Sequence, residues 1–175
     1  MKTVVNITAL ILSAFFCASA MAQQPDLKTD QAFIQTAVEK HGYYEESSPH
    51  GEYLSQKDRV AFSGCSMTVH VVTVGADEPP YKRETFKFDI LIDLKKLDPK
   101  PLVRLTDLNG NSLPVNREWI ILKTADGQEW IQMMRAGALM STSSAWLIQG
   151  GTDHAENQQI ADAFTRIITA CRASN

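Results

Sequence analysis

The chain has 175 residues, of which 44% are hydrophobic and 21% are charged, and its formal net charge at pH 7 is −3. This length and composition are typical of one globular domain with a sizeable core. The slight excess of acidic residues supplies no basic face, which excludes nucleic acid from the expected partners.

The N-terminal segment predicts a secretory signal peptide at residues 1–22. Lys2 gives a positive start, an apolar run follows at 9–17, and small residues suited to a signal peptidase occupy 18–22. The apolar run is shorter than the roughly 20 residues that a transmembrane helix needs. We therefore expect an exported protein, periplasmic or extracellular, whose mature chain is a single small domain at 23–175 without a transmembrane segment.

A short helix is predicted next. Thr29 or Asp30 can cap it, Gly42 can end it, and the residues at helical spacing between them are Phe33, Ile34, Ala37 and Val38. The stretch from Gly42 to Gln56 is polar and aromatic and follows neither the helical nor the strand period. We predict a loop there.

Two strands with clear alternation follow, at Cys65 to Val74 and at Phe86 to Leu94. In each of them apolar residues recur at every second position, which predicts one buried and one solvated face. The residues at 75–80 include two prolines, which cannot donate to a sheet ladder. We therefore predict a hairpin loop at 75–80 and an antiparallel pairing of the two strands.

Turn-forming pairs divide the next part of the chain into short strands. We predict these strands at Leu102 to Thr106, Trp119 to Thr124, Gln128 to Met134 and Ala145 to Gln149, with turns at Asn109-Gly110 and Asp126-Gly127. The second turn predicts a hairpin in which Trp119 and Trp130 pack across the two strands. The alternative role for these two rings is an aromatic binding platform.

An amphipathic helix is predicted at the C-terminal end. Asp153 is placed to cap it, and Glu156 follows three residues later as in a capping box. Its apolar residues form one stripe: Ile160, Ala161, Phe164, Ile167, Ile168 and Cys171. Such a stripe must be buried, and the strands offer the surface for it.

Together these elements predict an α+β fold. We expect a strongly bent antiparallel β-sheet or barrel of six to seven strands, with a short N-terminal helix and a C-terminal amphipathic helix that caps the sheet.

Three segments occur in a familiar order: an Asp-Leu-x-x-Leu-Asp-Pro phrase within 91–99, the apolar strand at 119–124, and the closing helix around 160–164. Over about residues 60–172 this order resembles bacterial pleckstrin-homology-like domains, in which a C-terminal helix plugs a bent antiparallel sheet. The resemblance implies a scaffold for recognition and does not fix a function. It does not imply a phosphoinositide ligand, because the basic cluster that some eukaryotic relatives use is missing.

Cys65 and Cys171 both point toward the predicted core, one from a strand and one from the helix stripe. In an exported chain this placement predicts a disulfide between them. The alternatives are two separate buried thiols or a catalytic thiol, which apolar surroundings disfavour. Cys17 lies in the signal segment, and the large rings of Phe15 and Phe16 precede it where a lipoprotein signal has a small residue.

The sequence contains no Gly-rich phosphate loop and no His-Glu-x-x-His, Cys-x-x-Cys or Gly-x-Ser-x-Gly motif. We therefore predict no catalytic residue, no cofactor and no metal. His41 and His50, with glutamates nearby, are of the right type for zinc, but their spacing matches no known site. We interpret them as part of a solvated surface loop.

The predicted loop is the expected contact surface for another protein. Tyrosine is enriched in interfaces, and acidic side chains can oppose a basic partner. The residues concerned are Tyr43, Tyr44, Glu45, Glu46, His50 and Tyr53. We expect an exported, non-enzymatic binding protein of inhibitor, immunity or accessory type.

Two other functions stay open. One is a hydrolase whose active site is assembled from residues far apart in the sequence. The other is a carrier for a lipid or small ligand, held on the concave side of the sheet by Met133, Met134, Leu139 and Met140, although such residues more commonly belong to a core. The oligomeric state is left undetermined by the sequence.

Overall fold

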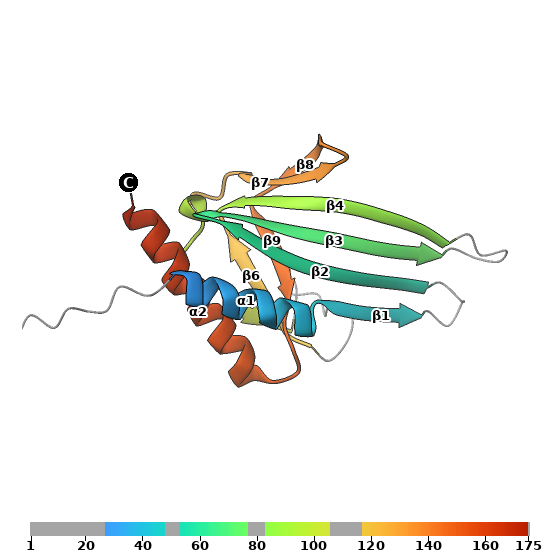
Figure 1. The fold of residues 1–175 in the computed structure, drawn as a ribbon, viewed down its shortest axis with the longest axis horizontal. Coiled ribbons are helices and arrows are strands. Elements are labelled where there is room, and N and C mark those ends of the chain that lie inside the picture. The colour runs from blue at the N-terminus through green and yellow to red at the C-terminus, as the bar shows by residue number, and fades with distance from the viewer. Residues whose placement is uncertain (1–26, 48–52, 77–82, 106–116, 175) are drawn as a thin grey trace, which may run out of the picture.

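The computed structural model describes residues 27–47, 53–76, 83–105 and 117–174. The predicted signal peptide at 1–22, the predicted turn at Asn109-Gly110 and His50 lie outside these residues. The described residues form two α-helices, one short 3-10 helix and two antiparallel sheets, which confirms the predicted α+β class (Figure 1).

The strands belong to two sheets instead of one. The helices are α1 (Leu27–His41), the 3-10 helix η1 (Leu94–Lys96) and α2 (His154–Ala173). The larger sheet has the strand order β1 (Tyr43–Ser47), β2 (Tyr53–Ser63), β3 (Ser66–Ala76), β4 (Arg83–Asp93), β7 (Ile131–Arg135) and β8 (Ala138–Ser143). The smaller sheet has the order β5 (Leu102–Arg104), β6 (Trp119–Lys123) and β9 (Ala145–Gln149). The described strands exceed the six to seven predicted, and they do not close into a barrel.

The long strands β2, β3 and β4 have 11 residues each and pair along their whole length. The predicted alternation on β3 and β4 is confirmed, because Val69 lies opposite Ile90, Met67 lies opposite Ile92, and all four are buried. Figure 1 shows that the two helices lie near one end of these strands, whose other ends extend past them.

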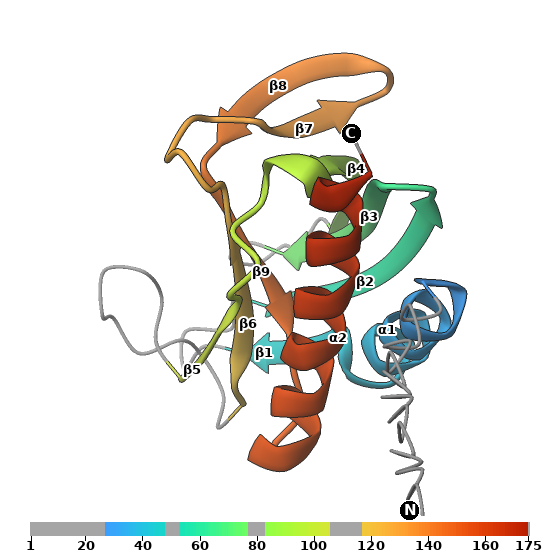
Figure 2. The same cartoon turned by 90° about the vertical axis from the view of Figure 1, so that its left-hand side faces the viewer.

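The predicted stripe of α2 is confirmed as the centre of the core. All six of its residues are buried: Ile160, Ala161, Phe164, Ile167, Ile168 and Cys171. They form one cluster with the inner face of the larger sheet and with Ile120, Leu122 and Ile148 of the smaller one. Figure 2 shows α2 between the smaller sheet and α1. Full burial of each large apolar side chain contributes about 1.5–3 kcal/mol, so the helix holds both sheets together.

No membrane-spanning helix is found within the described ranges, because no helix there combines sufficient length with sufficient apolar composition.

The predicted hairpin between β6 and β7 is wrong. The turn is present, since Gly127 has φ +71° and Asp126 accepts a hydrogen bond from the backbone nitrogen of Gln128. However, β6 pairs with β5 and β9, while β7 pairs with β4 and β8. Trp119 and Trp130 are therefore not cross-strand neighbours, and Trp119 is buried while Trp130 is exposed. The first four residues of β6 are all buried, which requires cover on both faces of this strand.

The predicted loop at 42–56 is also wrong, because β1 occupies Tyr43–Ser47 and β2 begins at Tyr53. The two strands pair in register from Tyr43 opposite Lys57 to Ser47 opposite Tyr53. β1 is an edge strand held by its backbone ladder, so it can form without an alternation of apolar side chains. The sequence pattern of a strand is therefore missing here.

The start of α1 differs from the prediction. The helix begins at Leu27, so Thr29 and Asp30 lie inside it instead of capping it. The buried Asp30 carboxylate accepts hydrogen bonds from Arg166 Nη2 at 2.6 Å and from Arg166 Nε at 3.0 Å. This bidentate pair joins the first turn of α1 to the middle of α2.

The start of α2 agrees with the prediction in part. Asp153 caps the helix, because its carboxylate accepts hydrogen bonds from the backbone nitrogens of Ala155 at 2.8 Å and Glu156 at 3.4 Å. The Glu156 carboxylate does not reach back as in a capping box. It contacts Lys40 Nζ at 2.7 Å and His41 Nε2 at 3.1 Å, at the end of α1.

The predicted disulfide between Cys65 and Cys171 is present. It joins the turn before β3 to the last turn of α2, across a separation of 106 residues. Cys171 is completely buried, and Cys65 packs against the same core cluster. The bond therefore fixes the end of the core helix to the larger sheet.

Replacing both cysteines by alanine is expected to lower the free energy of unfolding by about 4 kcal/mol, because a loop of this length loses about that much chain entropy when it is closed in the unfolded state. Urea denaturation followed by circular dichroism measures the change. Reductant should lower the stability of the natural chain and leave the double variant unchanged. Equal stabilities of the two oxidised proteins would contradict the prediction.

Gly42 lies where α1 gives way to β1 and is closely surrounded by backbone. A Cβ atom at this position would collide with the carbonyl oxygen of Val38 and would lie 3.0 Å from that of Asp58. We expect Gly42→Ala to lower the free energy of unfolding by roughly 2 kcal/mol or more. The control is Gly75→Ala on β3, where the added Cβ meets no atom within 4 Å. Equal urea midpoints for the two variants would count against this account.

Candidate functional site

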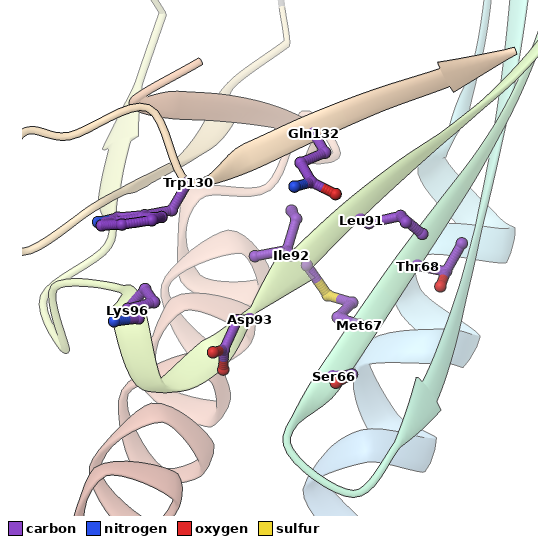
Figure 3. Close-up of a pocket in the computed structure, with 9 residues that line it drawn as sticks. All are labelled: Ser66, Met67, Thr68, Leu91, Ile92, Asp93, Lys96, Trp130 and Gln132. Atoms are coloured by element: carbon purple, nitrogen blue, oxygen red, sulfur yellow. The ribbon is translucent and has the colours of Figure 1, made fainter. Parts of the chain in front are cut away.

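A cleft of about 330 Å³ lies on the face of the larger sheet that carries Thr68, Leu91 and Gln132 (Figure 3). The register places Thr68 opposite Leu91 and Leu91 opposite Gln132, so the three side chains form one row across β3, β4 and β7. The buried Val69 and Ile90 alternate with this row and face the other way. The cleft is therefore on the outer face of the sheet, and the core is on the inner face.

Trp130 forms one end of the cleft and is held in place although it is 46% exposed. Its indole nitrogen donates to the Asp126 carboxylate at 3.0 and 3.2 Å. The Lys96 ammonium lies 4.7 Å from the ring centroid, which is the geometry of a cation–π contact. The hydrogen bonds from Trp130 and from the Gln128 backbone lower the pKa of Asp126, so this acceptor stays charged at neutral pH.

The cleft combines apolar and polar groups. Figure 3 shows Trp130 and Lys96 at one end and Leu91 and Thr68 at the other. Leu91, two residues before the end of β4, is 37% exposed and adds an apolar group to the cleft. Asp93 lies beside Lys96 and caps η1 by accepting a hydrogen bond from the Lys95 backbone at 3.0 Å. Such a surface can bury apolar side chains and also offer hydrogen bonds.

The hairpin of β7 and β8 continues this exposed apolar surface. Met134 lies opposite both Asp89 of β4 and Leu139 of β8, so Leu139 shares the outer face with Leu91. Leu139 and Met140 are 55% and 57% exposed. Both residues, which sequence reasoning placed in a core or in a ligand cavity, therefore lie on the open surface of the hairpin.

The six residues expected to contact a partner are only partly brought together. Tyr43, Tyr44, Glu45 and Glu46 lie on the edge strand β1, Tyr53 begins β2, and His50 lies outside the described residues. Tyr43 is 46% exposed, and its hydroxyl donates to Glu45 Oε2 at 2.7 Å. The expected contact segment is therefore a sheet edge over the described residues 43–47.

Three histidines each meet a carboxylate. His70 Nδ1 lies 2.7 Å from Asp89 Oδ1, His154 Nδ1 lies 2.7 Å from Glu118 Oε1, and His41 Nε2 lies 3.1 Å from Glu156 Oε2. The first pair is half exposed on the outer face of β3 and β4, and the His154 side chain is 71% exposed. Neither pair lines the cleft at Trp130.

The remaining pair, His41 and Glu156, belongs to the junction between the helices. The His41 ring packs against Gly151, where a Cβ atom would lie 2.7 Å from the ring. Hydrogen bonds from Lys40 and then from His41 lower the pKa of Glu156. These contacts hold the end of α1 against the start of α2. Within the ranges that the structure describes, no group of three or more metal-ligating side chains is found.

A second cleft of about 320 Å³ lies between the two helices and includes Asp30, Phe33 and Arg166. Asp30 and Arg166 bind each other there. The charges of Asp30 and Arg166 are therefore already used to join α1 to α2.

Asp58 on β2 is a buried carboxyl group that the sequence did not single out. It is 1% exposed, accepts a hydrogen bond from Gln56 at 3.0 Å through Oδ1, and has no hydrogen-bond partner for Oδ2 among the described residues. Burial raises its pKa from 3.8 to about 6, and the bond from Gln56 offsets part of this rise.

Asp58 should make the folded protein less stable as pH rises. Its pKa is higher in the folded state, so between pH 4 and pH 6 the folded state binds more protons than the unfolded state, and the free energy of unfolding falls with pH. A shift of this size corresponds to a loss of about 3 kcal/mol by pH 7.

Urea denaturation from pH 4 to pH 7 gives the free energy of unfolding of the natural chain and of Asp58→Asn. The value for the variant minus the value for the natural chain should rise by about 3 kcal/mol over this range. Glu84→Gln, at an exposed position of β4, is the control and should follow the natural chain. A difference independent of pH would refute this role of Asp58.

Comparison with family models, curated proteins and solved structures finds no match to this chain. The resemblance to bacterial pleckstrin-homology-like domains therefore stays a prediction.

Proposed function

We propose that the chain is an exported, non-enzymatic binding protein of inhibitor, immunity or accessory type, which acts by contact with another protein. The signal segment predicted at 1–22 supports export, and the disulfide between Cys65 and Cys171 is compatible with an oxidising compartment.

The observation that carries this proposal is the placement of Trp130. Tryptophan is among the residues that most often dominate the binding energy of an interface. Here the ring is exposed, yet Asp126 and Lys96 already restrict its orientation. A partner that buried it would therefore lose little side-chain freedom on binding, which increases the net affinity.

The surroundings of Trp130 favour a protein partner. Leu91 and Leu139 add exposed apolar groups on the same sheet face, while Gln132 and Asp93 surround the cleft with polar groups. An apolar centre with a polar rim is the usual anatomy of a protein interface. The His70–Asp89 and His154–Glu118 pairs lie outside the cleft, which favours binding over hydrolysis.

Trp130→Ala is the direct test. The disulfide-intact mature chain, residues 23–175, is immobilised and used to capture proteins from periplasmic extract and culture medium of cells that make it. We expect a protein held by the natural chain to bind Trp130→Ala about 30-fold more weakly and to be recovered correspondingly less, because loss of a dominant interface residue costs about 2 kcal/mol.

The matched control is Phe33→Ala, which removes another exposed ring, on α1 and far along the sequence from the cleft. This variant should capture as much as the natural chain, and both variants should melt near its temperature. Identical capture by Trp130→Ala and the natural chain, or capture of nothing by the natural chain, would contradict the proposed function.

A further inference from the structure

β1 forms one edge of the larger sheet and has a neighbouring strand on one side only, among the residues that the structure describes. One backbone contact between β1 and β2 shows which residues of β1 bond to β2. Tyr43 lies opposite Lys57, so Gly42 lies opposite Asp58, and the Asp58 backbone nitrogen donates to the Gly42 carbonyl at 2.6 Å. Hydrogen-bonded and non-hydrogen-bonded pairs alternate along an antiparallel ladder.

The backbone groups of Tyr44 are therefore turned toward β2, and those of Tyr43 and Glu45 are turned toward the open edge. A second contact agrees with this assignment, because the Arg117 guanidinium donates to the carbonyl oxygen of Tyr43. That carbonyl is thus outside the ladder. At the next outward position, the backbone N–H and C=O of Glu45 are directed to where a further strand would lie.

The charge of this edge selects the kind of strand that would fit. β1 carries Glu45 and Glu46 and no cation, and the Glu45 side chain is exposed. The cations Lys57 and Arg117 are both at the Tyr43 end of the strand. Negative charge is therefore concentrated from Glu45 onward.

Neither edge strand of the larger sheet of a second copy suits this edge. Pairing β1 with another β1 would bring glutamates near each other, which is unfavourable. The other edge strand of the larger sheet, β8, has the sequence ALMSTS and supplies no cation to oppose Glu45. An extended segment with a lysine or arginine opposite Glu45 meets both the charge and the hydrogen-bonding requirement.

We propose that β1 binds a basic, extended segment of a partner protein by strand addition, with the backbone of Glu45 as the central contact. This inference rests on the proposed function as a binding protein, and it assigns a surface separate from the cleft at Trp130. The sequence predicts that the tyrosines and glutamates at 43–46 contact a partner from a loop. In this proposal they contact it as a strand at the edge of the sheet.

Peptide binding to the disulfide-intact mature chain tests the proposal. The probe is a fluorescein-labelled decapeptide of alternating lysine and threonine, and its binding is followed by fluorescence anisotropy. We expect Glu45→Gln to weaken binding about 5-fold and Glu45→Pro to weaken it at least a further 10-fold, because proline also removes the outward N–H. A decapeptide of alternating glutamate and threonine should bind at least 30-fold more weakly than the lysine peptide.

The position of the proline provides the structural control. Proline is tolerated on an edge strand where the N–H faces away from the ladder. Glu45→Pro should therefore melt near the temperature of Glu45→Gln, while Tyr44→Pro should melt much lower because it removes a ladder bond to β2. Hydrogen exchange of the Glu45 amide should slow at least 10-fold when the lysine peptide is added.

Failure to bind the lysine peptide, equal binding by Glu45→Pro and Glu45→Gln, or unchanged exchange at Glu45 would each overturn strand addition. These outcomes are separate from the capture experiment with Trp130→Ala. If Trp130→Ala captures as much protein as the natural chain while the lysine peptide still binds at Glu45, the interface at the Trp130 cleft is overturned. Strand addition at β1 is then supported on its own.

Discussion

The apolar stripe of α2 is the constraint on which the rest of the domain depends. The helix can be buried only by contact with several elements at once, and its stripe shares one cluster with α1, the inner face of the larger sheet and the smaller sheet. The bond from Cys171 to Cys65 ties its end to the turn between β2 and β3. Because the inner faces are used in this core, the larger sheet can offer a partner only its outer face and its edges.

The elements with strong periodicity could be predicted from the sequence. Met67 and Val69 on β3 and Ile90 on β4 alternate because one face of each strand is buried, and the stripe of α2 has helical spacing for the same reason. The pairing of β6 could not be predicted. The turn residues Asp126 and Gly127 predict that the chain changes direction, but they do not predict which sheet the next strand joins.

The candidate surfaces were predictable only in part. Tyr43 and Glu45 could be selected as exposed contact residues by type, but their place on a strand could not, because an edge strand is stabilised by backbone bonds that leave no pattern in the side chains. Trp130 could be noticed as an aromatic residue near a turn. Its exposure depends on the separation of β6 from β7, and the contact with Lys96 depends on a position 34 residues away in sequence.

The hairpin of β7 and β8 is joined to the rest of the sheet by a short ladder. Only three residue pairs connect β7 to β4, from Asp89 and Met134 to Leu91 and Gln132, whereas β3 and β4 pair over 11 residues. We expect a unit with so few ladder pairs to separate from the sheet at a lower free energy than global unfolding requires. Any molecule seated against Gln132 and Trp130 would also brace this hairpin, so occupancy of the outer face and local opening of the domain are thermodynamically coupled.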